Sequence, residues 1–306
     1  ARMASEPSHD PELLKAIAEG YLAQHPPADA RAAAVARCGR EVGVDTEPEA
    51  PRRAGRAPSC LAEMKAIADD ATASPATRGA AALVLVQAGD PKAGARITGL
   101  AVTPVASERR ALLPILQRAP AAVALPVLMA FLDDDDLGIQ HAAAAAMGAF
   151  PTDECKLALK GYLSINFRRI ARAPTVVSLA TMDDADALRE LRGLLPQLTG
   201  VELVNGAAAL AAINDPRGVE ALERAAQGEN DLLRSLAGAK LMAKRPAMAR
   251  AVFERGMGHP AAALRVQTLD AFAATSLVDE SRLLSLLRDR DVAVGTRAAE
   301  LLLGRR

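Results

Sequence analysis

The hydrophobic residues of this chain recur at the spacing of one helix face. In the segment that begins at Gly200, apolar side chains stand at positions 201, 204, 208 and 211. The segment that begins at Asn230 has the same pattern at positions 233, 236, 237 and 241. Intervals of three and four residues bring side chains to one side of an α-helix. We therefore predict amphipathic helices over these segments.

Helix-start signals divide most of the chain into repeats of similar length. Pro follows a capping residue at Ser74-Pro75, Asp90-Pro91 and Asp215-Pro216. Pro suits the first position of a helix, and Ser or Asp before it satisfies the free amides of the first turn. The second helices of the predicted helix pairs begin near residues 76, 107, 136, 166, 200, 230, 260 and 291, which are 29 to 34 residues apart. We predict about eight two-helix repeats with a period of about 31 residues, stacked as an α-solenoid.

The N-terminal part of the chain fits this period less well. Asp10-Pro11 begins one predicted helix that ends near His25, and residues 28–42 form a second. The segment VDTEPEAPRRAGRAPS that follows is rich in Pro and charge and lacks an apolar stripe, which is typical of a loop. The sequence thus predicts an all-α chain in three parts: an atypical helical hairpin or cap at 1–43, a loop at 44–59 and the solenoid at 60–306.

Two nearly identical phrases indicate the kind of repeat. GDPKAGARITGLA begins at Gly89 and NDPRGVEALERAA at Asn214. Both resemble the start of the first helix in HEAT-like repeats of the phycobilisome-lyase type. The phrase DVAVGTRAAEL from Asp291 resembles the second helix of that family. The resemblance covers about residues 58 to 306 and implies the fold, but a fold does not imply one function.

The resemblance also implies a ladder of ion pairs. In that family an Arg near the start of the second helix commonly binds acidic residues of its own or the adjacent repeat. The matching residues here are Arg78, Arg109 or Arg110, Arg168 or Arg169, Arg234, Arg265 and Arg297. Gln140-His141 and Asn205 stand where an Arg is expected. We therefore expect the ladder to be interrupted in two repeats.

Composition supports helices and narrows the class of partner. Only 2% of the residues are aromatic, so the core is built from Ala, Leu and Val, and Ala is the best helix former. Lys plus Arg and Asp plus Glu balance at 37 each, which argues against a general nucleic-acid binder. No apolar run approaches the roughly 20 residues that span a bilayer. We expect neither a nucleic-acid partner nor membrane insertion.

The three cysteines, Cys38, Cys60 and Cys155, allow two interpretations. They have no CxxC spacing and no nearby His at ligand spacing. We favour three buried, reduced side chains. The alternative is a disulfide between Cys38 and Cys60, which would imply an oxidising compartment such as the periplasm or the extracellular space. Without it, a cytoplasmic location remains open.

Other polar clusters do not form a motif of known chemistry. The run Asp133–Asp136 lacks the alternating oxygens and the final Glu of an EF-hand loop, so we interpret it as a turn whose last Asp caps the next helix. His9, His25, His141 and His259 are scattered. A Walker loop, a GxSxG elbow and an HExxH helix are all missing from the sequence. We expect no catalytic residue, no metal and no cofactor.

These observations favour a non-catalytic scaffold that binds another protein through the concave face of the solenoid. The candidate binding residues are Arg109, Arg110, His141, Arg168 and Arg169. Two alternatives follow from HEAT-like relatives, a chromophore or prosthetic-group lyase and a DNA glycosylase. The first needs aromatic side chains around a tetrapyrrole, and the second needs a positive groove for DNA. The sequence favours neither, and we expect the protein not to be an enzyme.

Overall fold

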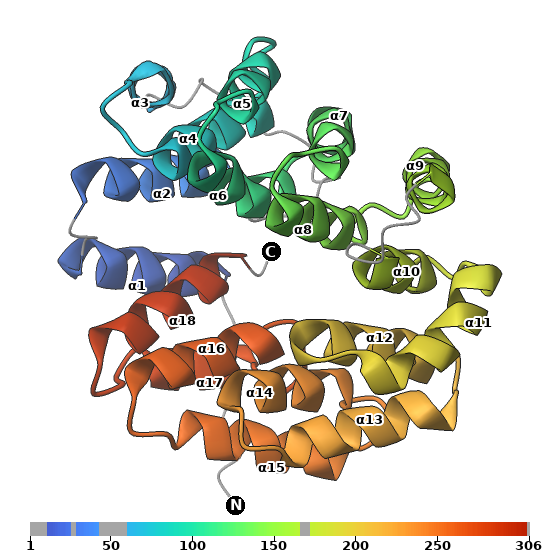
Figure 1. Cartoon of the computed structure of the whole chain (residues 1–306). Helices are drawn as coiled ribbons and strands as arrows, with labels where there is room; N and C mark the ends of the chain where they lie inside the picture. The colour runs from blue at the N-terminus through green and yellow to red at the C-terminus, as the bar shows by residue number, and fades with distance from the viewer. Residues whose placement is uncertain (1–10, 26–28, 43–59, 166–171, 305–306) are drawn as a thin grey trace, which may run out of the picture. The chain divides into compact units, whose positions relative to one another are not determined.

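The chain is described by a computed structural model that covers residues 11–25, 29–42, 60–165 and 172–304 (Figure 1). Every regular element in these ranges is a helix, which confirms the all-α prediction. The predicted loop at 44–59 and the candidate residues Arg168 and Arg169 lie outside the described residues. The helices form two compact units. Unit 1 holds the described residues of 1–33 and 228–306, and unit 2 holds those of 34–44 and 56–227.

Unit 2 contains most of the repeats. Its first helices are α3 (Leu61–Asp69), α5 (Ala93–Ala101), α7 (Ala121–Leu132), α9 (Asp153–Ile165), α11 (Ala185–Leu194) and α13 (Pro216–Gln227). Its second helices are α4 (Pro75–Gln87), α6 (Ala106–Leu116), α8 (Leu137–Met147), α10 (Arg172–Thr181) and α12 (Gly200–Ala212). A short 3₁₀ helix, η1 (Leu195–Gln197), extends α11. Helix α2 (Ala30–Val42) begins in unit 1 and continues into unit 2.

Unit 1 is made from both ends of the chain. It holds α1 (Pro11–Gln24), α14 (Asp231–Lys240), α15 (Pro246–Met257), α16 (Ala262–Phe272), α17 (Glu280–Leu286) and α18 (Val292–Gly304). From α3 onward, first and second helices alternate through eight pairs along the chain. This is the HEAT-like helical repeat arrangement that the sequence predicts.

The second helices form the more tightly packed layer of unit 2. Helix α4 packs on α6, α6 on α8, α8 on α10 and α10 on α12, whereas neighbouring first helices touch each other less. Small side chains permit this approach: Ala143 and Ala144 of α8 are completely buried, as are Leu112 and Leu116 of the neighbouring α6. Dense packing of this kind makes the layer a rigid surface.

The repeated turn phrase has a structural explanation. The residue after the helix cap of α4, α10 and α12 has a left-handed backbone: Gly89 (φ 84°), Asp183 (φ 60°) and Asn214 (φ 62°). The next residue is Asp in all three turns, and its amide donates to a carbonyl five residues back in the helix. This is the Schellman way to end a helix. The phrases GDP and NDP are therefore helix-stop signals, and the next helix begins at Pro216 of NDP and at Ala93, two residues after the Pro of GDP.

The same Asp joins consecutive first helices. Lys65 of α3 binds Asp90, Lys160 of α9 binds Asp184, and Arg192 of α11 binds Asp215. Each cation lies on the first helix that precedes the turn. The same ion pair thus recurs in three repeats. The Asp stabilises its own turn and links this turn to the first helix that precedes it.

Helix α1 packs on α18 within unit 1. Ala18 and Leu22 of α1 are buried, and the Tyr21 hydroxyl lies over the backbone of Gly295. A Cβ atom at Gly295 would stand 2.6 Å from the Tyr21 ring carbon Cζ, so only Gly leaves room for the ring. The first described helix thus covers the last one.

Candidate protein-binding surface

Four ladder arginines form hydrogen bonds with backbone carbonyls just before their own helix. The fourth residue of α4, α6, α14 and α16 is Arg78, Arg109, Arg234 and Arg265. The guanidinium of each donates to a backbone carbonyl at the end of the preceding helix or in the turn after it, at 3.2 Å to Ala68, 2.9 Å to Thr103, 3.1 Å to Gly228 and 2.9 Å to His259. Carbonyls at such a turn lack helical partners, so the Arg satisfies groups that would otherwise be buried without one.

Two of these arginines also bind an Asp of the next repeat. Arg109 forms two hydrogen bonds with Asp134, at 2.7 and 2.8 Å. Arg265 does the same with Asp289, at 3.2 and 2.6 Å. The hydrogen bonds from Arg109 hold the pKa of Asp134 below its usual value, although burial acts in the opposite direction. Burial also acts to raise the pKa of Asp289, and the hydrogen bonds from Arg265 and the Asp291 amide outweigh it.

The other ladder positions differ from the pattern that the sequence suggested. Gln140 is the fourth residue of α8, and its side-chain amide donates to the Asp134 carbonyl at 2.6 Å. It therefore replaces the Arg as the donor to the preceding turn. The fourth residue of α12 is Leu203, and Asn205 lies two residues further on. The fourth residue of α18 is Gly295. Arg297 binds Asp270 of α16 and Glu300 of its own helix instead of turn carbonyls.

His141 lies on the exposed side of the second helices of unit 2. Because Gln140 holds the turn, the neighbouring His141 is available for another contact, and its Nε2 is hydrogen-bonded to the Glu202 carboxylate of α12. Both side chains are half-buried. Arg110 of α6 reaches the same side of α8, where it binds Asp136 at 3.1 Å.

Small and polar side chains surround these contacts. We define the second-helix face by six residues of α6, α8 and α12, which are Ser107, Arg110, His141, Ala142, Ala145 and Asn205. All six are exposed or half-buried. The face contains two of the five residues that the sequence singled out for binding, Arg110 and His141. Arg109 lies in the ladder beside it.

The two candidate arginines that the structure describes are therefore paired with acids. Arg109 and Arg110 bind Asp134 and Asp136, the two members of the acidic run that also organise the α7–α8 turn. Asp136 caps α8 by accepting from the amides of Gly138 and Ile139. Sequence reasoning missed Glu202, because a carboxylate 61 residues from His141 leaves no local signal.

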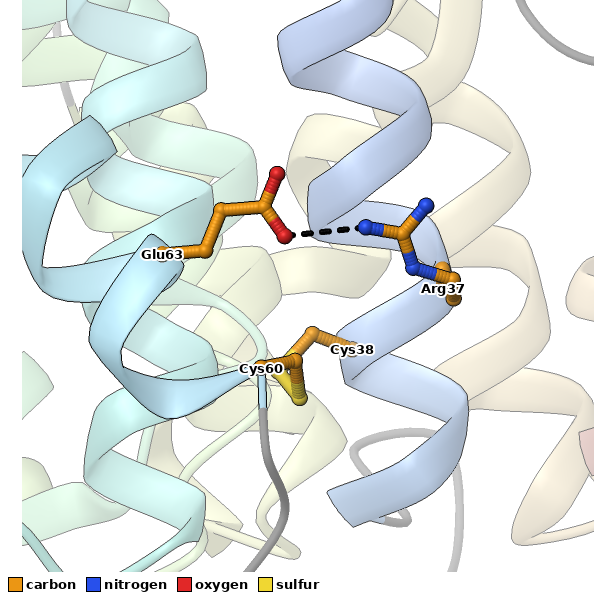
Figure 2. Close-up of a disulfide and its surroundings, with 4 residues drawn as sticks. All are labelled: Arg37, Cys38, Cys60 and Glu63. Atoms are coloured by element: carbon orange, nitrogen blue, oxygen red, sulfur yellow. Dashed lines mark hydrogen bonds and ion pairs between the residues drawn. A yellow bond between two sulfur atoms is a disulfide. The ribbon is translucent and has the colours of Figure 1, made fainter.

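A disulfide in unit 2 joins α2 to the N-cap of α3 (Figure 2), so the interpretation of three reduced cysteines that we favoured is wrong. It connects Cys38 and Cys60, whose Cα atoms are 5.6 Å apart, and Arg37 binds Glu63 beside it at 2.9 Å. Closure of a loop of this length stabilises a fold by about 3 kcal/mol in the chain-entropy model. Cys155 is a free, buried thiol, and burial raises its pKa to about 11, which makes it a poor nucleophile.

Neither a metal site nor a membrane segment is recognisable in the part of the chain that the structure describes. Its His, Cys, Asp and Glu side chains nowhere form a group of three that could hold a metal ion. None of its helices combines the length and the hydropathy that a membrane crossing requires.

Comparisons with known proteins leave both the family and the activity open. No family model matches the chain, and no curated protein matches it. Among solved structures, the chain is similar to human deoxyhypusine hydroxylase in complex with glycerol. The identity is 19%, the match covers 79% of this chain and 94% of that chain, and the TM-score is 0.38. A likeness at this level carries no argument about substrate or mechanism.

One expectation from the sequence needs correction. We expected a protein that is not an enzyme, because the repeats carry no catalytic motif. We withdraw that expectation, because a missing motif does not exclude activity and a solved structure to which the chain is similar is an enzyme by its title. Catalytic groups on a helical repeat can come from distant parts of the sequence and leave no local pattern.

Proposed function

We propose that this chain binds another protein through the second-helix face. The observation that carries the proposal is the contact between His141 and Glu202. It sets two polar side chains among small ones on a surface whose helices pack tightly. Extended surfaces of stacked repeats are the usual binding sites of helical repeat proteins. Small side chains such as Ala142 and Ala145 let a partner approach closely, and His141 offers a specific polar contact.

The charges of this face favour a protein over a nucleic acid. Arg110 is offset by Asp136, and His141 faces Glu202. Nucleic-acid binding needs a basic excess to displace counterions from phosphates, and such an excess is not found among these residues. The finer assignment, repeats of the phycobilisome-lyase type, rests on the turn phrases at Gly89 and Asn214 and belongs to the same proposal.

A pair of matched substitutions tests the proposal. Ala145 of α8 and Ala130 of α7 are both exposed and lie near the ends of adjacent helices. A photo-reactive amino acid at position 145 is used to identify the bound protein in the native cell, with position 130 as the control. The affinity of the purified partner is then measured for Ala145→Lys and Ala130→Lys.

We expect Ala145→Lys to weaken binding at least about tenfold, because a long charged side chain obstructs a close interface. Ala130→Lys should bind like the wild type. The proposal fails if no protein cross-links at position 145, or if Ala145→Lys leaves the affinity unchanged while both variants remain folded.

A further inference from the structure

Two neighbouring turns of unit 2 carry exposed apolar side chains that the fold does not require. Val102 is 78% exposed and Val105 46% exposed in the turn between α5 and α6, and Leu137 is 48% exposed at the start of α8. Arg109 joins the two turns, because its guanidinium binds both the Thr103 carbonyl and Asp134. Single exposed apolar residues are ordinary, but a group of them marks an interaction site.

Val105 is an apolar residue at the start of a helix. It is the N-cap residue of α6 and forms no side-chain hydrogen bond there. Ser74 caps α4 and Asp136 caps α8 with their side chains, as expected for N-cap positions. Other N-cap residues such as Lys92 and Ala261 also lack this hydrogen bond, but Val105 in addition leaves a branched apolar side chain 46% exposed.

The charges beside these apolar side chains are mainly negative. Residues 102–110 and 133–141 include five carboxylates, those of Glu108 and Asp133–Asp136, against the two guanidiniums of Arg109 and Arg110. Three negative charges are therefore in excess here, although the whole chain is neutral. Asp134 and Asp136 are bound to the arginines, whereas Asp133 and Asp135 are exposed.

We propose that this turn edge, formed by Val102, Val105, Asp133, Asp135 and Leu137, binds a basic segment of a partner protein. The segment carries Lys or Arg side chains on both sides of an apolar one. The net negative charge of the turn edge repels the phosphates of nucleic acids and anionic lipid surfaces. The exposed Val and Leu side chains favour a peptide over a free cation. The inference rests on the proposed protein-binding function and adds a second surface with a defined charge.

A designed peptide tests the proposal directly. The probe is a fluorescent peptide of about ten residues in which Lys and Leu alternate, and its binding to the full chain is followed by anisotropy. We expect Asp133→Asn/Asp135→Asn to weaken binding about tenfold at low salt, because exposed charges beside an interface act mainly through long-range attraction. Binding to the wild type should weaken steeply towards about 1 M salt, where charges are screened within about 3 Å.

The control removes two carboxylates elsewhere in unit 2. Asp183→Asn/Asp186→Asn changes two exposed residues before and within the first turn of α11, and Asn tolerates the left-handed backbone of Asp183. This variant should bind the peptide like the wild type. A second variant, Val105→Thr/Leu137→Gln, should weaken binding several-fold, and a peptide with Ser in place of Leu should not distinguish it from the wild type.

Three results would overturn the inference. These are no binding of the Lys-Leu peptide, equal binding by the two Asp variants, and full affinity after Val105→Thr/Leu137→Gln. If the turn-edge variants keep the affinity of the cross-linked partner while Ala145→Lys loses it, the turn edge is wrong and the second-helix face stands.

Discussion

A single buried Arg supports two turns of unit 1 at once. The Arg265 side chain is 3% exposed, and it binds the His259 and Pro260 carbonyls on one side and Asp289 on the other. We predict that Arg265→Ala lowers the free energy of unfolding by about 3 kcal/mol, because it leaves a buried carboxylate and turn carbonyls without their partner. Chemical denaturation measures this loss.

Arg297 provides the control for this prediction. It also binds carboxylates, but its side chain is 36% exposed and it holds no turn carbonyl. Solvent screens such pairs, so Arg297→Ala should cost less than about 1 kcal/mol. Equal losses for the two variants would contradict the ladder role of Arg265.

Acid should weaken the ladder in a predictable direction. The pKa of Asp134 is lowered in the fold, chiefly by its hydrogen bonds with Arg109. A carboxyl with a lowered pKa stabilises the fold above its unfolded pKa of about 3.9, and this contribution is lost as the pH falls through the folded pKa. We predict that the melting temperature falls below about pH 4. Asp134→Asn should lower the melting temperature at pH 7 and make the acid decline shallower, whereas an acid decline parallel to that of the wild type would speak against this account.

At the scale of helices, the packing of α1 on α18 depends on one glycine. A Cβ at Gly295 would collide with the Tyr21 ring. We predict that Gly295→Ala displaces α1, so that hydrogen exchange of its amides becomes much faster while α14–α16 stay protected. Gly161 of α9 is the control, because a Cβ there meets no atom within 4 Å. Gly161→Ala should stabilise the protein by about 0.5–1 kcal/mol, and unchanged exchange of α1 in Gly295→Ala would refute the prediction.

The elements themselves could be predicted from the sequence because their signals are local. Ser74, Asp90 and Asn214 mark helix starts and ends within a few residues, and the apolar spacing supplies the rest. The partner of α1 could not be predicted in this way. Tyr21 and Gly295 are complementary in shape, but no local sequence pattern around either residue predicts their contact.

For the molecule as a whole, the sequence identified the layers but not the surface chemistry. Four of the predicted ladder arginines, Arg78, Arg109, Arg234 and Arg265, occupy the same position of their helices. The acids that neutralise Arg109 and Arg110 lie about 25 residues further along the chain. Likewise, His141 meets Glu202 across two repeats. The sequence alone therefore does not show which candidate arginines are neutralised, since ion pairing depends on how the repeats stack.

The disulfide leads to a prediction about the whole molecule in its cell. Disulfides persist in oxidising compartments, so we propose that this chain resides in one. If thiols are alkylated at lysis and after denaturation, we expect mass spectrometry to find one modified cysteine, Cys155, without reductant and three after reduction. Three modified cysteines without reductant would place the chain in a reducing compartment.

The packing of α1 on α18 has a consequence for synthesis. Residue 24 leaves the ribosome 268 residues before residue 292, which at common elongation rates is a delay of about 13–54 s. A helix of 14 residues is marginal on its own in water. The apolar side of α1, including Leu22, therefore lacks its native partner α18 while the other repeats are synthesised. During this interval it is accessible to a chaperone.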